Sequence, residues 1–378
     1  MSNVPSYFID FLRNIRITES QVQDCKNGHS TLRDRLLKDE DLKDIVVATF
    51  LQGSYRRSTA IRPFEDRRKS DVDIIIVTNL DRNKITPREA LERFRPFLEK
   101  HYKGKYKPQG RSWGIELSYV QLDLVPTSAP SEALKQLVKS ASVSTDQTLE
   151  EARDWRLSLS WRSGKSLGAI LEKAGDEQWR NEPLWIPDRE AQEWHKTHPL
   201  AQIEATQRKN AACNGYYLDV VKCLKWWRTT QRREPKYPKS YPLEHLCCIN
   251  CADGIQSVAA GVVSALEGIR DVYRTDVEQK RTPRVPDHGV PEHNVLGRVS
   301  PDDFVAFHEH ITEAAELARR AYNEEDLHES VILWRQLFGD RFPDPPAKKD
   351  DGNGESPDKP GGYTPRKNVS IIGGGRFA

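Results

Sequence analysis

A β-branched run that opens with two aspartates constrains this fold more than any other feature of the sequence. The stretch from Asp71 to Leu80 begins DVDIIIV, a composition that favours a buried strand. Residues two apart on a strand point to the same face, so Asp71 and Asp73 share one face while Val72 faces the core. A sheet that contains this strand must therefore bury one face and present two carboxylates on the other.

A third carboxylate lies in LDLVP at residues 122–126, within a stretch from Trp113 to Val125 that predicts two short strands or one strand with a bulge. Strands of one sheet can bring Asp123 close to the other two aspartates. Three like charges so close raise each other's pKa, and a pair of hard cations such as Mg²⁺ removes the conflict. Two such ions clamp the attacking and leaving oxygens of an in-line phosphoryl displacement. Each fragment alone is common in strands, but together and in this order they predict a metal-dependent phosphoryl-transfer site.

A glycine and a serine follow an earlier predicted strand, residues 45–51, which reads IVVATFL. Gly53 lets the backbone approach a phosphate closely, and the Ser54 hydroxyl with the following amides can hold a polyphosphate. A plain turn is the alternative for this dipeptide.

Helical and strand patterns alternate from about residue 18 to 130, which is typical of an α/β or α+β fold. The pair Thr18 and Gln21 has capping-box spacing and opens one helix. Pro87 opens another, whose apolar residues Leu91, Phe94 and Leu98 recur at helical spacing.

The composition suits a strongly charged globular protein. Of the 378 residues, 37% are hydrophobic and 30% charged, and the mean hydropathy is −0.72. With 58 basic and 56 acidic residues the net charge is only +2, so an anionic partner must be met by local patches. Apolar stretches such as Ile74–Val77 are too short to span a membrane, no secretion signal is evident, and six cysteines are too few for a disulfide framework. We expect a cytoplasmic protein.

Three regions differ in composition and in their pattern of apolar residues, and the fold class they predict is α+β. We expect a catalytic core with N-terminal helices in residues 1–150, a mostly helical lobe in 151–340 and a disordered tail in 341–378. The tail holds six Pro and seven Gly and cannot bury enough surface to offset its ordering entropy. The helical lobe has long helical patterns such as Cys213–Arg228, and residues 175–200 look like a Trp- and Pro-rich connection.

The motifs together resemble the polymerase β-type nucleotidyltransferases. The matching stretches are LQGSYRRST at 51–59, DVDIIIV at 71–77 and LDLVP at 122–126. More narrowly, the chain resembles the bacterial cGAS/DncV-like nucleotidyltransferases (CD-NTases) of CBASS anti-phage defence. It is close to their clade D through QGRS at 109–112 and YPLEHL at 241–246.

The resemblance implies a two-lobed enzyme, with a mixed β-sheet in the catalytic lobe, helices in the second lobe and the active site in the cleft. The implied activity is that of a cyclic oligonucleotide synthase. Such an enzyme joins ATP, with or without GTP, into a cyclic di- or trinucleotide second messenger and releases pyrophosphate. We expect an adenine-rich trinucleotide, sensed by a downstream effector. Nucleic acid would not be required, nor a membrane.

The resemblance also implies roles for individual residues. Asp71 and Asp73 would ligate two Mg²⁺ ions, for which Mn²⁺ could substitute. Asp123 would ligate the catalytic metal and act as the base-like acceptor near the attacking 3′-hydroxyl. The implied nucleotide-binding residues come from both lobes: Gln52, Gly53, Ser54, Lys225, Ser240, Tyr241 and Asp287.

The second lobe contributes a basic run at residues 222–239. Lys225 precedes a Trp pair, as the triphosphate-binding lysine does in the resembled family, and lysine suits a polyphosphate as a mobile point charge. Ser240 and Tyr241 match the family's phosphate-contacting serine and base-stacking aromatic. The alternatives are a solvated helix face for the lysines and core packing for the Trp pair.

A cluster of thiols with one histidine invites a zinc interpretation: His245, Cys247, Cys248 and Cys251. They fall within seven residues, far tighter than the separated ligand pairs of structural zinc sites. We therefore expect small, buried, apolar cysteines there instead.

The chain ends GGGRFA after the Pro- and Gly-rich tail. A flexible linker with a short tip suits recognition by an enzyme that must reach a C-terminal carboxylate. In the resembled systems an E1/E2-like partner adenylates the C-terminus and conjugates it to other molecules, which implies conjugation at Ala378. A plain disordered terminus is the alternative.

Two other functions stay open at this point. The same fold could transfer a nucleotide to an RNA 3′ end or to a small-molecule hydroxyl. The chain could also be a catalytically inactive, nucleic-acid-binding regulator that uses the basic run 222–239. The intact acidic trio argues against that regulator, because uncompensated buried carboxylates are costly to keep without a metal.

Overall fold

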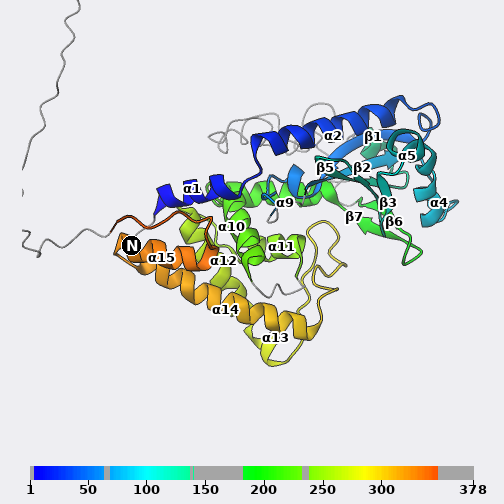
Figure 1. Ribbon diagram of the computed structural model, residues 1–378. Helices are drawn as coiled ribbons and strands as arrows, with labels where there is room; N and C mark the ends of the chain where they lie inside the picture. The colour runs from blue at the N-terminus through cyan, green and yellow to red at the C-terminus, as the bar shows by residue number, and fades with distance from the viewer. Residues whose placement is uncertain (1–3, 64–68, 137–138, 140–181, 232–237, 348–378) are drawn as a thin grey trace, which may run out of the picture. The chain divides into compact units, whose positions relative to one another are not determined.

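A computed structural model describes residues 4–63, 69–136, 139, 182–231 and 238–347. The chain divides into a compact unit, Met1–Pro345, and a second unit, Pro346–Ala378. Every element named below belongs to the first unit (Figure 1). The predicted domain boundary near residue 150 and most of the predicted tail lie outside the described residues.

A five-stranded mixed sheet organises the first half of the chain (Figure 1). Its strands lie in the order β1 (Val46–Gln52), β2 (Ser70–Thr78), β5 (Val120–Pro126), β4 (Trp113–Glu116) and β3 (Tyr106–Pro108). β2 and β5 run parallel, and the other neighbours are antiparallel. The mixed sheet is therefore confirmed, and so are the two short strands, β4 and β5, within the stretch from Trp113 onward.

Side chains alternate between the two faces of β2, and each face packs into a different hydrophobic core. Val72, Ile74 and Ile76 pack with the apolar face of α2 (Glu19–Lys38) in one cluster. Ile75 and Val77 pack with residues of β6 (Leu184–Asp188) and α9 (Pro199–Ala212) in another. Since Asp71 and Asp73 share the parity of Ile75 and Val77, the carboxylates lie on the face covered by β6 and α9.

The predicted helix starts are confirmed, and one helix is shorter than expected. Thr18 and Gln21 form a capping box at the start of α2, and Thr86 caps α4 (Pro87–Glu92) in the same way. The single helix predicted to include Leu91, Phe94 and Leu98 instead breaks after Glu92 and resumes as α5 (Arg95–Tyr102). Pro96 stands in the first turn of α5, where a proline costs no helical hydrogen bond.

The Trp- and Pro-rich stretch is not a plain connection, which corrects the prediction for residues 175–200. From residue 184 it forms an antiparallel hairpin of β6 and β7 (Glu193–Thr197). Trp194 donates from Nε1 to the carbonyl of Ile85, and Leu184 and Ile186 are buried. The hairpin thus contributes to the core on the carboxylate face of the sheet.

The remaining helices pack around a third core (Figure 1). They are α10 (Tyr217–Thr230), α11 (Ser240–Asn250), α12 (Val258–Val272), α13 (Arg274–Glu278), α14 (Pro301–Asn323) and α15 (Leu327–Phe338). The N-terminal helix α1 (Pro5–Ile15) joins this core through Phe8 and Phe11. Phe342 is fully buried against those two rings, so the compact unit continues past the predicted tail boundary at residue 340.

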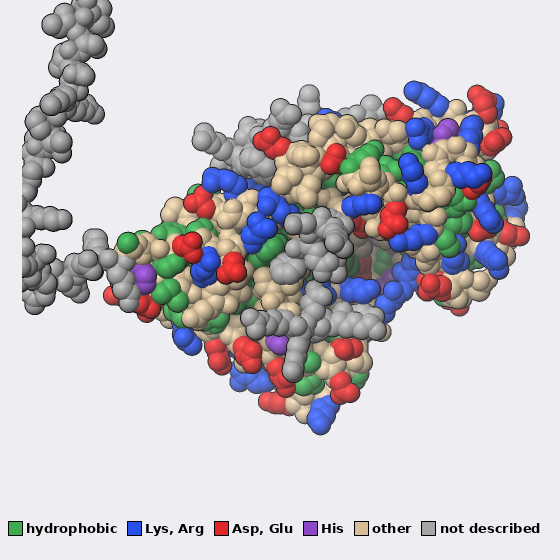
Figure 2. All heavy atoms as spheres, viewed as in Figure 1, with side chains coloured by type: hydrophobic (Ala, Val, Ile, Leu, Met, Phe, Trp, Pro, Cys, Tyr) green, Lys and Arg blue, Asp and Glu red, His purple; other side chains and the backbone are tan. Residues whose placement is uncertain are grey.

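Basic and acidic side chains are interspersed on the face of the molecule shown in Figure 2, as the near-zero net charge leads one to expect. Among the described residues, no helix is both long enough and apolar enough to cross a membrane.

Candidate active site

Sheet register brings the three predicted aspartates together. In the parallel pair of β2 and β5, Asp73 lies opposite Asp123, and Asp71 lies two residues earlier on the same face. Asp71, Asp73 and Asp123 each offer a carboxylate oxygen, and these oxygens lie within 4.8 Å of one another. In the part of the chain that the structure describes, no other group of His, Cys, Asp or Glu residues meets this criterion for a metal site.

All three carboxylates of this crowded group have a raised pKa. Desolvation, followed by Asp73 and Asp123, raises the pKa of Asp71 to about 8, although its side chain opens to solvent. Desolvation and Asp73 raise the pKa of Asp123 to about 6. Burial also raises the pKa of Asp73, against the opposing influence of Arg57. Carboxylate oxygens are ligands that divalent cations prefer, and a bound cation offsets the repulsion between the three negative charges. The trio therefore fits a divalent metal site.

Gly53 is required where the chain leaves β1. Its φ is +72°, and a Cβ there would lie 1.8 Å from Oδ2 of Asp73. Any side chain would therefore displace one of the three carboxylates. Gln52 pairs with Asp73 across the strands, and Ser54 follows in the short helix α3 (Gly53–Arg56).

A cavity of about 630 Å³ adjoins the carboxylates and is lined by both halves of the chain. Of the predicted site residues it contains Gln52, Gly53, Ser54, Asp71, Asp73, Lys225, Ser240 and Tyr241. Basic side chains join them on its wall, among them Arg62, Lys69 and Arg228. Asp123 and Asp287 are not among its lining residues.

Lys225 is buried, with 6% of the residue exposed, so a solvated helix face is the wrong description for it. Its ammonium donates to the carbonyl of Thr59 at 2.8 Å and to Oε1 of Glu244 at 2.9 Å. Lys222 is also buried. The Trp pair that follows Lys225 packs in the helical core, as the alternative interpretation predicted. Residues 232–237 of the basic run lie outside the described residues.

Two buried residues of this site were missed from the sequence, Arg57 and Glu244. Arg57 donates from Nε and Nη2 to Oε2 of Glu244 at 3.2 and 3.1 Å. Burial alone would raise the pKa of Glu244, but Arg57 and Lys225 lower it overall. For Glu244 the signal in the sequence was an acidic residue between the leucines of YPLEHL.

Tyr241 and Asp287 act as a pair. The phenol donates to Oδ2 of Asp287 at 2.5 Å, and the guanidinium of Arg57 lies 5.3 Å from the centre of the Tyr241 ring. The other oxygen of Asp287 accepts from the amides of Gly289 and Val290. Asp287 therefore holds the aromatic side chain and its own loop, and it lies behind the cavity wall.

The cysteines occupy the positions expected of small apolar side chains. Cys247 and Cys251 are buried in the helical core, Cys248 is partly buried against it, and all three are free thiols. Burial raises the pKa of Cys247, which makes its thiolate harder to form.

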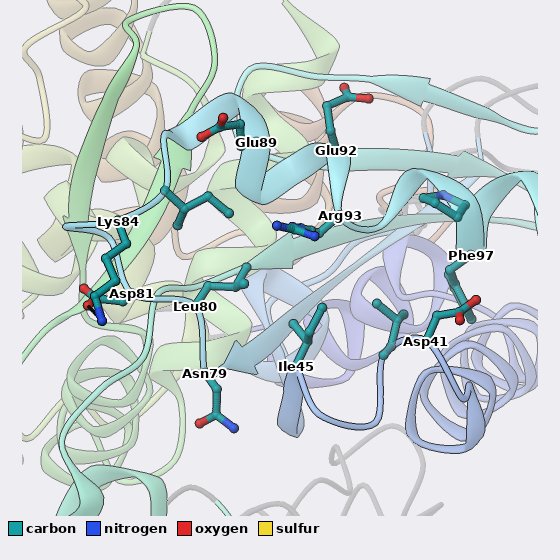
Figure 3. A pocket seen from close by; sticks show the side chains of 13 residues that line it. Asp41, Ile45, Asn79, Leu80, Asp81, Lys84, Glu89, Glu92, Arg93 and Phe97 are labelled. Atoms are coloured by element: carbon teal, nitrogen blue, oxygen red, sulfur yellow. Dashed lines mark ion pairs between the residues drawn. The ribbon is translucent and has the colours of Figure 1, made fainter.

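A larger cavity, of about 840 Å³, lies at the opposite end of β1 and β2 (Figure 3). Apolar side chains such as Ile45, Leu80 and Phe97 line it together with charged residues of both signs, including Glu89 and Arg93. It contains none of the predicted site residues. Size alone therefore does not identify the active site.

Comparison with known proteins agrees with this geometry. Residues 1–142 match the Second Messenger Oligonucleotide or Dinucleotide Synthetase domain. The chain is 48% identical to the cyclic AMP-AMP-GMP synthase of Enterobacter hormaechei, over 98% of both chains. It is 31% identical to the cyclic AMP-AMP-AMP synthase of an Acinetobacter strain, over 89% of this chain and 84% of the relative.

Solved structures show the same fold. The CD-NTase CdnG of Bradyrhizobium diazoefficiens, in complex with GTP, superposes with a TM-score of 0.64 at 13% identity, over 89% of this chain and 95% of that one. The structural likeness supports the two-lobed architecture, and the sequence identities show which family the chain belongs to. With an acidic trio on adjacent strands, a cavity lined by both lobes and these relatives, the chain belongs to the bacterial cGAS/DncV-like nucleotidyltransferases, the CD-NTases, and is a cyclic oligonucleotide synthase.

Proposed function

We propose that this synthase joins two AMP units and one GMP unit, drawn from ATP and GTP, into a cyclic trinucleotide second messenger of anti-phage defence, with Mg²⁺ as its metal. The observation that carries the proposal is the convergence of Asp71, Asp73 and Asp123 beside a cavity with basic walls. The choice of bases rests on the name of the Enterobacter relative, which is 48% identical along nearly the whole chain.

The three aspartates are the proposed metal ligands. Two divalent cations bound there would lower the pKa of an attacking 3′-hydroxyl and offset charge on the phosphates. Gly53 keeps Asp73 in place by carrying no Cβ. Asp123, a proposed ligand of the catalytic metal, is also the proposed acceptor near that hydroxyl.

The cavity walls supply the proposed nucleotide contacts. Gln52, Gly53 and Ser54 line the side nearest the carboxylates, where we place the donor triphosphate. Lys225 contributes positive charge from the helical lobe, and its contact with Thr59 ties the two lobes at this point. The Tyr241 ring, held by Asp287, is the proposed stacking platform for a base.

Product analysis tests this function. Purified protein incubated with ATP and GTP should release pyrophosphate and form a phosphatase-resistant cyclic trinucleotide, identified by mass spectrometry. The double variant Asp71→Asn/Asp73→Asn should form none, whereas Asp81→Asn, at the cavity remote from the site, should match wild type. A cyclic product from the double variant would refute the assignment of the carboxylates.

The same experiment separates the alternatives. Transfer to an RNA 3′ end or a small-molecule hydroxyl would require an added acceptor, so no product would form from nucleotides alone. A catalytically inactive regulator would release no pyrophosphate and would bind DNA with a steep salt dependence.

Conjugation at Ala378 stays a prediction from the family resemblance, since residues 348–378 lie outside the described part of the chain. Intact mass spectrometry with the E1/E2-like partner and ATP tests it, because an adduct should appear on the wild-type chain. A cytoplasmic location is likewise a proposal, supported by the nucleotide substrates and by six free cysteines.

A further inference from the structure

One hydrogen bond reaches the third aspartate from a loop that lies outside β2 and β5, the two strands that carry the aspartates. Gln109, just after β3, donates from Nε2 to Oδ1 of Asp123 at 3.1 Å. The hydroxyl of Ser112 donates to Oε1 of the same glutamine at 2.6 Å. A carboxylate can only accept, so the amide nitrogen must face Asp123, and the amide oxygen is left for the serine. The serine thereby fixes which end of the amide meets the carboxylate.

The surrounding backbone leaves room for this side chain and little else. Gly114 lies opposite Asp123 in the pairing of β4 with β5. A Cβ at Gly114 would lie 2.5 Å from Nε2 of Gln109 and 3.5 Å from Oδ1 of Asp123. The absence of a side chain on β4 is therefore what allows the amide to approach the carboxylate.

The loop is braced from the β6–β7 hairpin. Arg189 donates its backbone amide to the carbonyl of Gly110 at 2.8 Å, and Arg111 donates from Nε to Oδ2 of Asp188 at 2.8 Å. Asp188 is itself held by the backbone amides that follow it in the hairpin turn. The loop that carries Gln109 is thus held to the hairpin by a backbone hydrogen bond and by an ion pair.

We propose that Gln109 is a positioning residue for Asp123, which it holds at Oδ1 so that the carboxylate is oriented for metal binding before nucleotide arrives. The proposal rests on the proposed role of Asp123. Ser112 acts through Gln109, because its hydroxyl donates to the amide oxygen and so sets the direction of the amide. Gln121, two residues before Asp123 on β5, is a second polar contact of the carboxylate, so loss of Gln109 loosens the carboxylate without stripping it of partners.

The test variant is Gln109→Leu, which keeps the approximate size and removes the donor. Groups that orient metal ligands typically contribute about 10- to 100-fold to metal affinity or activity. We expect Mn²⁺ affinity, measured by electron paramagnetic resonance with a non-hydrolysable ATP analogue, to weaken by about 10-fold or more, and kcat to fall about 10- to 100-fold. The KM for ATP should stay within about twofold, because the phosphate contacts are untouched.

The matched control is Gln23→Leu, the same substitution at an exposed glutamine of α2 that contacts Asn27, and it should behave as wild type. Ser112→Ala should weaken Mn²⁺ binding less than Gln109→Leu does. The double variant should equal Gln109→Leu alone, since the serine acts only through the glutamine. If Gln109→Leu fails to fold, as judged by its thermal transition, the Mn²⁺ affinity of Ser112→Ala decides.

Wild-type Mn²⁺ affinity in Gln109→Leu, or additive losses in the double variant, would overturn the proposal. Asp123→Asn separates this result from failure of the proposed site. If Asp123→Asn is inactive while Gln109→Leu is unaffected, only the positioning role is lost. If Asp123→Asn is active, the assignment of the third carboxylate is lost as well.

Discussion

Single atoms decide whether the carboxylates can occupy their positions, and Gly53 is the sharpest case. The sequence alone suggested that this glycine lets a phosphate approach. The structure adds that a Cβ would first meet Asp73, at 1.8 Å from Oδ2. The glycine therefore serves the metal ligand directly, a role that depends on the spacing between β1 and β2 and could not be read from the sequence.

Gly53→Ala should reduce nucleotide transfer by about 100-fold, since small misplacements of reacting groups cost that much. It should also lower stability by about 1–2 kcal/mol through its positive φ. Gly104→Ala is the matched control, because Gly104 has φ +71° and nothing within 4 Å of its added Cβ. Chemical denaturation should show a stability loss in both variants, and initial-rate assays should show activity lost only in Gly53→Ala. Equal activity in both variants would contradict it.

His245 gives a prediction for pH. Its ring packs against that of His288 with centroids 4.0 Å apart and a tilt of 33°. Burial, followed by His288, lowers its pKa to about 4 against the influence of Asp287. The unfolded imidazole titrates near 6.5, so between pH 6.5 and 4 the unfolded state takes up the proton first. The fold therefore loses stability as pH falls through this window, by at most about 3 kcal/mol.

The measurement is the free energy of unfolding of wild type and of His245→Gln at pH 7.5 and pH 4.5. The advantage of wild type over the variant should shrink at the lower pH. His310→Gln on α14 is the reference substitution for removing an imidazole elsewhere in the helical lobe. An advantage that grows toward low pH would contradict the prediction.

At the scale of elements, a helix or strand could be predicted where its apolar residues recur with a clear period. The strand with Asp71 and Asp73, and its neighbour with Asp123, were predictable because a two-residue period sets the face of every side chain. The break between α4 and α5 was harder, since Leu91, Phe94 and Leu98 are all buried as one continuous helix would bury them. The hairpin from residue 184 was not predicted because Trp185 and Pro187 obscure the alternation of apolar and polar residues. The strands of the main sheet that it packs against also lie far away in the sequence.

Glu244 could not be assigned for a similar reason, because its two cations come from different elements. It joins α11 to Lys225 on α10 and to Arg57 after α3. Glu244→Ala should leave two buried cations unpaired and lower the free energy of unfolding by about 3–5 kcal/mol. The control is Glu267→Ala, which breaks the more exposed pair with Arg319 and should cost about 1 kcal/mol or less. Urea unfolding compares them, and equal losses would contradict a buried network.

For the whole molecule, the compact unit ends later than composition suggested. The tail looked featureless from residue 341, because one aromatic among prolines and aspartates carries no periodic signal. Phe342 is nevertheless buried beside Phe8, Phe11 and Phe338. The last turn of the fold therefore closes onto the first helix.

Two truncations test this boundary. A chain ending at Pro345 should keep the thermal stability of the full protein and its synthesis of product. A chain ending at Asp340 loses the buried ring of Phe342 and should be less stable by at least about 3 kcal/mol. Differential scanning calorimetry measures both, and equal stability in the two chains would show that the aromatic cluster contributes nothing.

The strand that carries Asp123 is the last of the sheet to be synthesised, yet it occupies the middle, between β2 and β4. A nascent chain that has left the ribosome only as far as β4 holds the first two aspartates and no partner strand to complete them. Insertion of β5 joins the β1–β2 and β3–β4 ribbons and brings the third carboxylate to the other two in the same event. A partly melted sheet that releases β5 therefore loses the third carboxylate and the continuity of the sheet together.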